Sequence, residues 1–483
     1  MSRARLAALG PLVLLAGCSL APPTDLPEPP VPQTWPAGDA YLAQRESDLP
    51  TVSYESVFTD PRLRALVGQA LANNRDLRVA AANVAAARAQ VRATRANQFP
   101  EIGVTGSATY RGTGDNGTPR TGTGGGTGAN IVGRDGMSYS LQGGVSSYEI
   151  DLFGRLANAT RAERQRALAS EAAARTVRLG LVADLANAWA TYAADRELLG
   201  IAQATADNAR RSIELTRARL EGGVAPRTDL RQAEQVLTTA QGDIAEQTAR
   251  IAQDENLIRL LVGAAFDKSL LPSSLAEVTA SFSPLAAGTS SEVLLRRPDV
   301  IEAEYALRAA DFDIGTARAA LFPAISLTGV LGFASDALSS LFDGDAFSYT
   351  AGGNLSAPLF DAGRRGANVD IARARREAAL ATYEGTIQTA FREVADALAD
   401  QGTLAERLRA ARAFTAAAAD TARLTEARYR GGIDSYLTSL DAQRSEYAAR
   451  RAEIATLLAL AANRVTVYRV LGGDLATPVS EPE

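Results

Sequence analysis

The most constraining feature of this chain is a sequence pattern that occurs twice at a fixed spacing. Residues 71–77 return as residues 294–300, and Phe99-Pro100 returns as Phe322-Pro323, both at an offset of 223 residues. From residue 154 onward the offset is 209, which implies one insertion of about 14 residues in the first copy. A unit that keeps its length so strictly is a rigid structural part, so we expect a fold built from two copies of it.

The matches at the second offset extend to the end of the repeated region. They pair Gly154-Arg155 with Gly363-Arg364, residues 221–224 with 430–433, and residues 261–263 with 470–472. The boundaries that follow are 1–17 for a signal peptide, 18–55 for an N-terminal tether, 56–263 for repeat 1, 264–290 for a linker, 291–472 for repeat 2 and 473–483 for a C-terminal tail.

The N-terminus has the form of a bacterial export signal. Arg3 and Arg5 precede the apolar run 6–15, which is too short to span a bilayer as a helix. The run ends in Leu15-Ala-Gly-Cys18, which resembles a lipobox, where the cysteine is acylated with fatty acids such as palmitate and becomes the mature N-terminus. Ser19 stands where an inner-membrane retention signal would show Asp, which favours the outer membrane. The alternative is an ordinary signal peptide with a chance cysteine.

Composition excludes several classes of function. The chain has one cysteine and no histidine, so it can form no internal disulfide and lacks the commonest general base and metal ligand. The glycine-rich run 122–128 has no lysine and is not a phosphate loop. We therefore expect no enzyme and no cofactor. Without residues 1–17 the chain carries 48 basic and 55 acidic residues in mixed order, which gives no indication of nucleic-acid binding.

Two pairs of segments alternate apolar and polar residues with the period of a β-strand. They cover residues 102–110 and 137–152 in the first copy, and 325–333 and 347–359 in the second. These lengths suit tilted transmembrane strands, although two soluble β-hairpins are an alternative. The apolar phase slips in the second segment, so we expect a β-bulge near Ser146-Ser147. The mature chain has no apolar stretch near 18 residues, so any membrane crossing is expected from strands.

Long helices are expected around these hairpins. Helical patterning runs from near Ser56 to about Gln98, and proline-free helices are predicted over 155–220 and 364–430. The two long helices would each reach about 100 Å at 1.5 Å per residue. Each ends at a Gly-Gly pair suited to a left-handed C-cap. Pro226 is expected at a first helical position, and the return helices end at about Val262 and Leu471.

The strand number implies an oligomer. Four strands cannot close a barrel, and an open edge in lipid leaves backbone groups without hydrogen bonds. Three chains would supply twelve strands, which we expect to form a closed cylinder that the helical hairpins continue.

Three motifs carry a resemblance to a known family. They are Leu295-Arg-Arg-Pro-Asp-Val300, Leu359-Phe-Asp-Ala-Gly-Arg364, and residues 429–443 with the sequence YRGGIDSYLTSLDAQ. With the lipobox, the chain resembles the TolC-like outer membrane factors, in the NodT-like branch of efflux lipoproteins. The resemblance implies a homotrimer with a 12-stranded β-barrel in the outer membrane of a Gram-negative bacterium and an α-helical barrel in the periplasm. It also implies a periplasmic adaptor protein and an inner-membrane pump, usually of the resistance-nodulation-division class, as partners.

The resemblance further implies site residues. Leu437 and Asp441 match ring positions of the periplasmic gate, and Arg444 matches a basic neighbour that tethers it. The expected adaptor contacts are the hairpin tips, at Gly222, Gly223, Val224, Gly431, Gly432 and Ile433. A plain surface role for Asp441 is the alternative. We interpret Arg296, Arg297 and Asp299 as structural residues that position the following helix.

The sequence favours a duct that exports drugs or other small molecules across the periplasm and outer membrane. Two alternatives remain: a duct for protein secretion, and a trimeric structural lipoprotein without a pore. The polar face of the alternating strands disfavours the structural lipoprotein, and the lipobox disfavours protein secretion.

Overall fold

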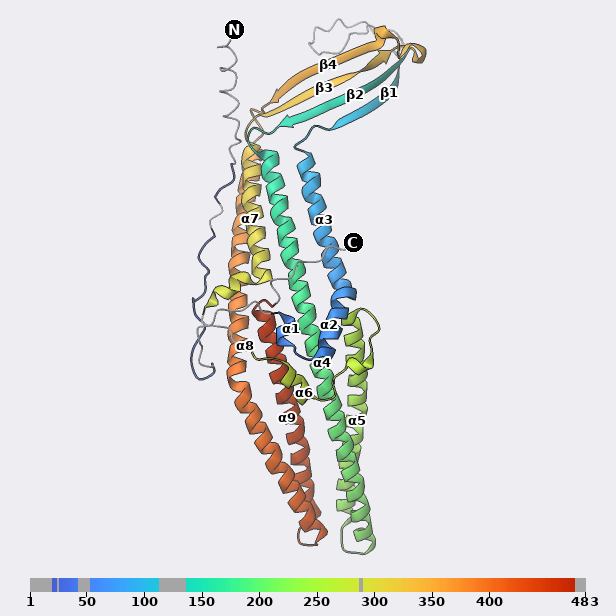
Figure 1. The fold of residues 1–483 in the computed structure, drawn as a ribbon, viewed down its shortest axis with the longest axis vertical. Helices are drawn as coiled ribbons and strands as arrows, with labels where there is room; N and C mark the ends of the chain where they lie inside the picture. Colours follow the sequence, from blue (N-terminus) through green and yellow to red (C-terminus); the bar gives the residue numbers. More distant parts are fainter. Residues whose placement is uncertain (1–19, 24–25, 42–52, 113–135, 286–289, 474–483) are drawn as a thin grey trace. The chain divides into compact units, whose positions relative to one another are not determined.

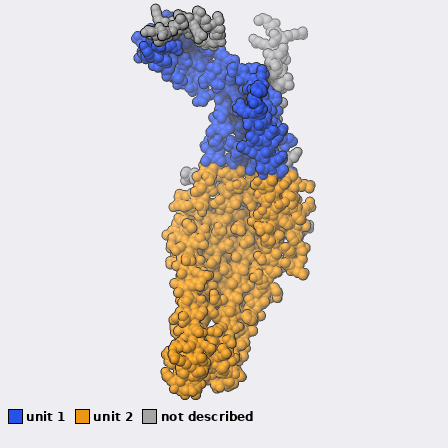
Figure 2. Space-filling view, turned by 180° about the vertical axis from the view of Figure 1, so that it is seen from behind, with its two compact units in different colours: residues 1–26, 86–167, 306–380 blue, residues 27–85, 168–305, 381–483 orange. Residues whose placement is uncertain are grey.

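The computed structural model describes residues 20–23, 26–41, 53–112, 136–285 and 290–473. The chain divides into two compact units (Figure 2). Unit 1 contains residues 1–26, 86–167 and 306–380, and unit 2 contains residues 27–85, 168–305 and 381–483. Each unit therefore takes segments from both sequence copies.

Unit 1 holds a four-stranded antiparallel sheet in the order β1-β2-β3-β4 (Figure 1). The strands are β1 (Ile102–Arg111), β2 (Gly136–Ile150), β3 (Ala324–Ser335) and β4 (Phe347–Ser356), where the alternating segments predicted them. The register between β2 and β3 shifts between Val145 and Tyr148, which confirms the predicted bulge. The central β2–β3 pairing joins a strand of the first copy to a strand of the second.

Two helices of 67 residues each follow the strand pairs: α4 (Arg155–Glu221) and α8 (Arg364–Arg430). They begin and end within one residue of the predicted positions. Each is followed by a return helix, α5 (Arg227–Val262) after α4 and α9 (Tyr436–Val470) after α8. Pro226 was predicted as the first helical residue, but it is the N-cap of α5, and the helix begins one residue later at Arg227. No helix among the described residues is apolar over a stretch that could span a membrane.

The first predicted helix is in fact three helices. They are α1 (Tyr54–Val57), α2 (Pro61–Asn73) and α3 (Arg75–Ala96). Asn74 breaks the pattern because its extended backbone ends α2 while its side chain accepts hydrogen bonds from the N–H groups of Asp76 and Leu77 (2.8 and 3.1 Å) and so caps α3. The counterpart of α3 in the second copy is α7 (Pro298–Ala319). The short helix α6 (Leu275–Ser281) and 3₁₀ turns at 268–270, 291–296, 338–340 and 344–346 complete the fold.

The main core of unit 2 consists mostly of aliphatic side chains and contains an aromatic cluster that joins four separate segments. Phe58 follows α1, Trp189 lies in α4, Phe282 follows α6, and Tyr468 lies in α9, and all four are fully buried. The Phe58 ring lies 5.0 Å from that of Phe282 and 5.3 Å from that of Tyr468, in edge-on contacts. The indole N–H of Trp189 donates to the Leu270 carbonyl (2.9 Å), so its polar atom is satisfied.

Arg297 fastens the start of α7 within unit 2. The buried guanidinium donates to the carboxylates of Asp299 (2.7 Å) and Glu393 (2.9 Å) and to the carbonyl of Val470 (3.1 Å). It therefore ties α7, α8 and α9 together, as expected of a positioning residue. Arg296 is exposed, so the neighbouring arginine takes no part in this contact.

The α4–α5 hairpin contains two carboxyl groups in contact. Asp195 of α4 is buried, and its side chain forms a hydrogen bond with that of Asp254 of α5. Burial and the neighbouring Asp195 charge raise the pKa of Asp254 to about 7. Burial also raises the pKa of Asp195, while nearby Arg250 lowers it. Two carboxyl groups in contact share a proton, so this pair holds the hairpin best in its protonated form.

This pair predicts a pH-dependent stability. An acid whose pKa is raised in the folded chain keeps its proton there at pH values where the unfolded chain has lost it. Stability should therefore fall as the pH rises from about 4, the pKa of a free aspartic acid, to about 7. Asp254→Asn should flatten this fall, because the amide needs no proton to donate a hydrogen bond to Asp195. The pH dependence of stability is measured as the Tm in detergent across this pH range. Asp207→Asn, at an exposed aspartate, is the control. Equal slopes for the two variants would contradict the assignment.

Candidate functional site

The two helical hairpins each turn at a Gly-Gly pair with the same geometry. Gly223 and Gly432 have φ of 72° and 73°, the left-handed conformation that ends a helix. The N–H of the next residue, Val224 or Ile433, donates back to the carbonyl of Arg219 or Arg428, at 2.9 Å in each case. The predicted left-handed caps are thus confirmed at both turns.

The predicted tip residues lie at these turns. They are Gly222, Gly223 and Val224 in the first hairpin, and Gly431, Gly432 and Ile433 in the second. Val224 is 79% exposed and Ile433 is 67% exposed. Each turn therefore presents one exposed apolar side chain.

The tips of the two hairpins pack against each other. Ile213 of α4 and Ala233 of α5 form a small buried cluster with Tyr429, Tyr436 and Leu440 of the second hairpin. The Tyr429 hydroxyl lies 3.2 Å from that of Thr216 in α4. Burial raises the pKa of Tyr436 to about 12, so this phenol stays neutral in its apolar surroundings.

The two turns are stabilised differently. In the second hairpin Arg428 forms a two-pronged ion pair with Asp434 (2.5 and 2.9 Å), and these hydrogen bonds lower the pKa of Asp434. At the matching positions of the first hairpin stand Arg219 and Ala225, so the acid is missing. Arg219 instead donates to the Arg430 carbonyl (3.0 Å) and lies over the Tyr429 ring, 4.4 Å from its centre. Arg428 and Arg219 occupy matching positions but have different roles. Arg428 closes the second turn, whereas Arg219 links the first hairpin to the second.

The predicted gate residues share one face of α9. Leu437, Asp441 and Arg444 follow each other at spacings of four and three residues, and all three are exposed. The opposite face of α9 is buried through Ser439 and Ala442, and Leu440 beside the predicted gate residues is buried as well. Among the described residues neither Asp441 nor Arg444 forms an ion pair. Leu437 and Asp441 are exposed in the single chain, and Arg444 lines a groove towards the first hairpin. The gate itself remains a prediction.

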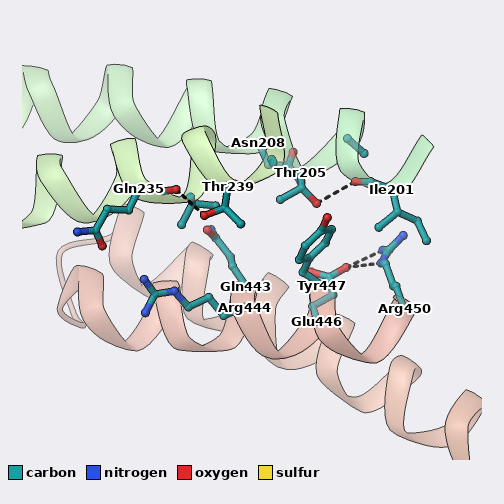
Figure 3. Close-up of a pocket in the computed structure, with 13 residues that line it drawn as sticks. Ile201, Thr205, Asn208, Gln235, Thr239, Gln443, Arg444, Glu446, Tyr447 and Arg450 are labelled. Atoms are coloured by element: carbon teal, nitrogen blue, oxygen red, sulfur yellow. Dashed lines mark hydrogen bonds and ion pairs between the residues drawn. The ribbon is translucent and has the colours of Figure 1, made fainter. Parts of the chain in front are cut away.

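A groove of about 170 Å³ lies between α9 and the first hairpin (Figure 3). One side is lined by Gln443, Arg444, Glu446, Tyr447 and Arg450 of α9, and the other by α4 and α5. The lining from the first hairpin consists of Ile201, Ala204, Thr205, Asn208, Gln235, Val236, Thr239 and Ala240.

One hydrogen bond crosses from the second hairpin to the first near this groove. The Tyr447 hydroxyl of α9 donates to the carboxylate of Asp243 in α5. Burial, followed by this hydrogen bond, raises the pKa of Tyr447 to about 12.

Sequence reasoning did not identify the residues that connect the two hairpins, which are Tyr429, Tyr436, Tyr447 and Asp243. One sequence signal was available for two of them, because Tyr429 and Tyr436 flank the second Gly-Gly pair where the first copy has Leu220 and Arg227. Cys18 lies outside the described residues. The described residues contain no group of three acidic, cysteine or histidine side chains placed to hold a metal ion.

Known proteins of similar sequence and fold include outer-membrane efflux proteins and an outer-membrane channel. The sequence model of the outer membrane efflux protein family matches residues 66–264 and 289–473. The probable efflux pump outer membrane protein TtgC of Pseudomonas putida is 40% identical over 466 residues, which cover 95% of this chain and 93% of TtgC.

Solved structures agree with this assignment. A membrane protein from Pseudomonas aeruginosa has a TM-score of 0.84 at 36% identity, with 96% of this chain and 99% of that chain covered. The open state of the Neisseria gonorrhoeae outer membrane channel MtrE has a TM-score of 0.81 at 31% identity, with coverage of 95% and 99%. This chain belongs to the outer membrane efflux protein family.

Proposed function

We propose that this protein is the outer-membrane exit duct of a tripartite efflux system and that it passively exports small molecules. The observation that carries the proposal is the combination, in one chain, of a four-stranded antiparallel sheet with two hairpins of very long helices. Membership of the efflux family agrees with it. Such a chain supplies walls for a conduit rather than groups for a reaction.

The working form is a homotrimer. Strands β1 and β4 are the outer strands of the sheet, and each pairs with one neighbour within the described chain. In a bilayer the free edges would leave N–H and C=O groups without partners at a cost of several kcal/mol each. Pairing β1 of one copy with β4 of the next in a ring of three gives twelve strands. The two tandem repeats, 56–263 and 291–472, then give each chain two strand hairpins and two helical hairpins.

The hairpin tips are the contact with a periplasmic adaptor protein, which connects the duct to an inner-membrane pump of the resistance-nodulation-division class. Support comes from the exposed Val224 and Ile433 at the two turns. The tips are also well ordered by their caps and by the Arg428–Asp434 ion pair, so they present a fixed surface.

A deletion strain tests the proposed function. Cells without the gene should accumulate more ethidium than the parent strain, and the gene on a plasmid should restore the lower level. The same strain should secrete its usual set of proteins into the medium. Unchanged ethidium accumulation together with loss of a secreted protein would contradict the proposal and favour a protein secretion duct.

The periplasmic gate is formed by rings of Leu437 and Asp441 around the threefold axis, with Arg444 beside them. The exposure of Leu437 and Asp441 on one face of α9 supports this assignment. Three copies of Leu437 would form an apolar constriction, and three carboxylates brought close together would attract cations.

Replacing both ring residues tests the gate. Leu437→Ala with Asp441→Ala should raise the conductance of the duct in a planar bilayer, because it removes the constriction and three negative charges. Block by divalent cations from the periplasmic side should weaken at the same time. Since these side chains are exposed, trimer stability should change little. Thr228→Ala with Gln232→Ala, at the matching positions of the first hairpin, is the control. Wild-type conductance and unchanged block in the α9 variant would place the constriction elsewhere.

Cys18 is the lipid attachment site that anchors the mature N-terminus in the outer membrane. Cells fed a labelled palmitate should incorporate the label into the wild-type protein and not into Cys18→Ser. The mature part of the variant should still fold, because its described core lies entirely after residue 26. An unlabelled wild-type protein would rule out the anchor.

A further inference from the structure

The N-terminal segment makes specific contacts in unit 2, although its proline-rich composition suggests a loose tether. Residues 26–41, coloured dark blue in Figure 1, contain no helix and no strand of the sheet. Trp35 in this segment is nevertheless only 3% exposed. Its indole stacks on the ring of Phe391 in α8, with the ring centres 5.2 Å apart and the planes at 28°. A buried tryptophan is the largest apolar anchor that a side chain can provide.

Backbone hydrogen bonds fix the segment just before this anchor. Thr34 forms an antiparallel bridge with Ser290. The N–H and hydroxyl of Ser291 donate to the carbonyls of Gln33 (2.8 Å) and Pro32 (2.6 Å). The segment is therefore held by a short β-type pairing on one side of Trp35.

A glycine in the middle of α8 receives the backbone on the other side of Trp35. Residues 38–41 form a turn, in which the Tyr41 N–H donates to the Gly38 carbonyl (3.0 Å). This turn places the Ala40 carbonyl against Gly402, where an added Cβ would lie 2.0 Å from the carbonyl oxygen. No side chain fits in that space. Glycine weakens a helix interior relative to alanine, and at Gly402 the close approach of the Ala40 carbonyl offsets this cost.

Other glycines of α8 show that this contact is specific. Gly366 and Gly385 lie in the same helix, and an added Cβ would meet nothing within 4 Å at either. In unit 1 a related contact occurs at Gly315 of α7, where an added Cβ would lie 2.8 Å from the side-chain amide of Asn158 and 2.9 Å from Ala21. Arg318, one turn later in α7, donates to the Leu20 carbonyl (3.1 Å). Both described parts of the N-terminal segment thus meet a helix at a glycine.

We propose that residues 32–41 are a strap that binds a preformed track on unit 2, and that the seated strap stabilises α8. The track consists of Ser290, Ser291, Phe391 and Gly402. Phe391 lies two residues before Glu393, the partner of Arg297, so the strap and Arg297 contact α8 at neighbouring positions along its axis but on different sides. The strap is thus an integral part of the helical packing, and this inference does not depend on the proposed export function.

The two tryptophans of the chain allow a direct test. In a Trp189→Phe background Trp35 is the only tryptophan, so its fluorescence reports whether the strap is seated. Gly402→Ala should shift the emission to longer wavelength, increase quenching by acrylamide and lower Tm, because the new methyl group displaces the Ala40 carbonyl. Gly385→Ala, the matched control in the same helix, should leave emission and quenching unchanged and should not lower Tm.

The result that overturns the proposal is equal behaviour of the two alanine variants in emission, quenching and Tm. If Gly402→Ala yields no folded protein, Phe391→Ala in the same background removes the stacking partner and leaves the helix backbone intact. Exposure of Trp35 to quencher in this variant supports the strap. A Trp35 that stays protected there shows that the track does not hold it.

Discussion

Unpaired backbone at the two outer strands is the constraint on which the rest of this structure depends. The sheet order leaves one edge of β1 and one edge of β4 without a partner in the described chain. Its surface carries exposed apolar side chains, such as Ile102, Val104, Tyr349 and Leu355, which suit contact with lipid or another chain. Lipid offers no hydrogen bonds to such edges, so in the proposed outer-membrane duct other copies of the chain complete the sheet. The proposed trimer follows from this argument.

The same local device connects strand to helix in both copies, which explains how sheet and helices are built from one repeated unit. Gly154 and Gly363 have positive φ of 74° and 85° immediately before α4 and α8. An aspartate before each glycine caps the helix: Asp151 accepts from the Ala157 N–H (2.7 Å), and Asp361 from the Arg365 N–H (3.3 Å). The copies differ most at the opposite ends of the helices. There Asp434, Tyr429 and Tyr436 have no equivalents in the first hairpin, and these residues both close the second turn and hold the two tips together.

Much of this architecture could be predicted from the sequence because it depends on local periodicity. The strands, their bulge, the two 67-residue helices and the left-handed glycine caps all follow from spacing within one segment. The break at Asn74 was not predicted because the helical sequence pattern continues through it. The helix ends there because the Asn74 side chain accepts hydrogen bonds from the backbone of the next helix. The link between Tyr447 and Asp243 could not be predicted at all. It joins residues about 200 positions apart, and only tertiary packing places their helices side by side.

The glycines within the helices are a second case in which the sequence alone does not show a tertiary contact. Gly180, Gly200, Gly366 and Gly385 face open space, whereas Gly315 and Gly402 receive another segment's backbone. In sequence all six are isolated glycines within an alanine-rich helix, and each weakens its helix similarly. Only the segments that pack against them distinguish these glycines: the N-terminal segment at Gly402, and the N-terminal segment together with the Asn158 side chain at Gly315. A proline-rich stretch with little secondary structure of its own therefore gains a fixed path from the helices on which it lies. Composition alone would indicate a solvated, extended chain. Burial of Trp35 against Phe391 favours the bound path instead.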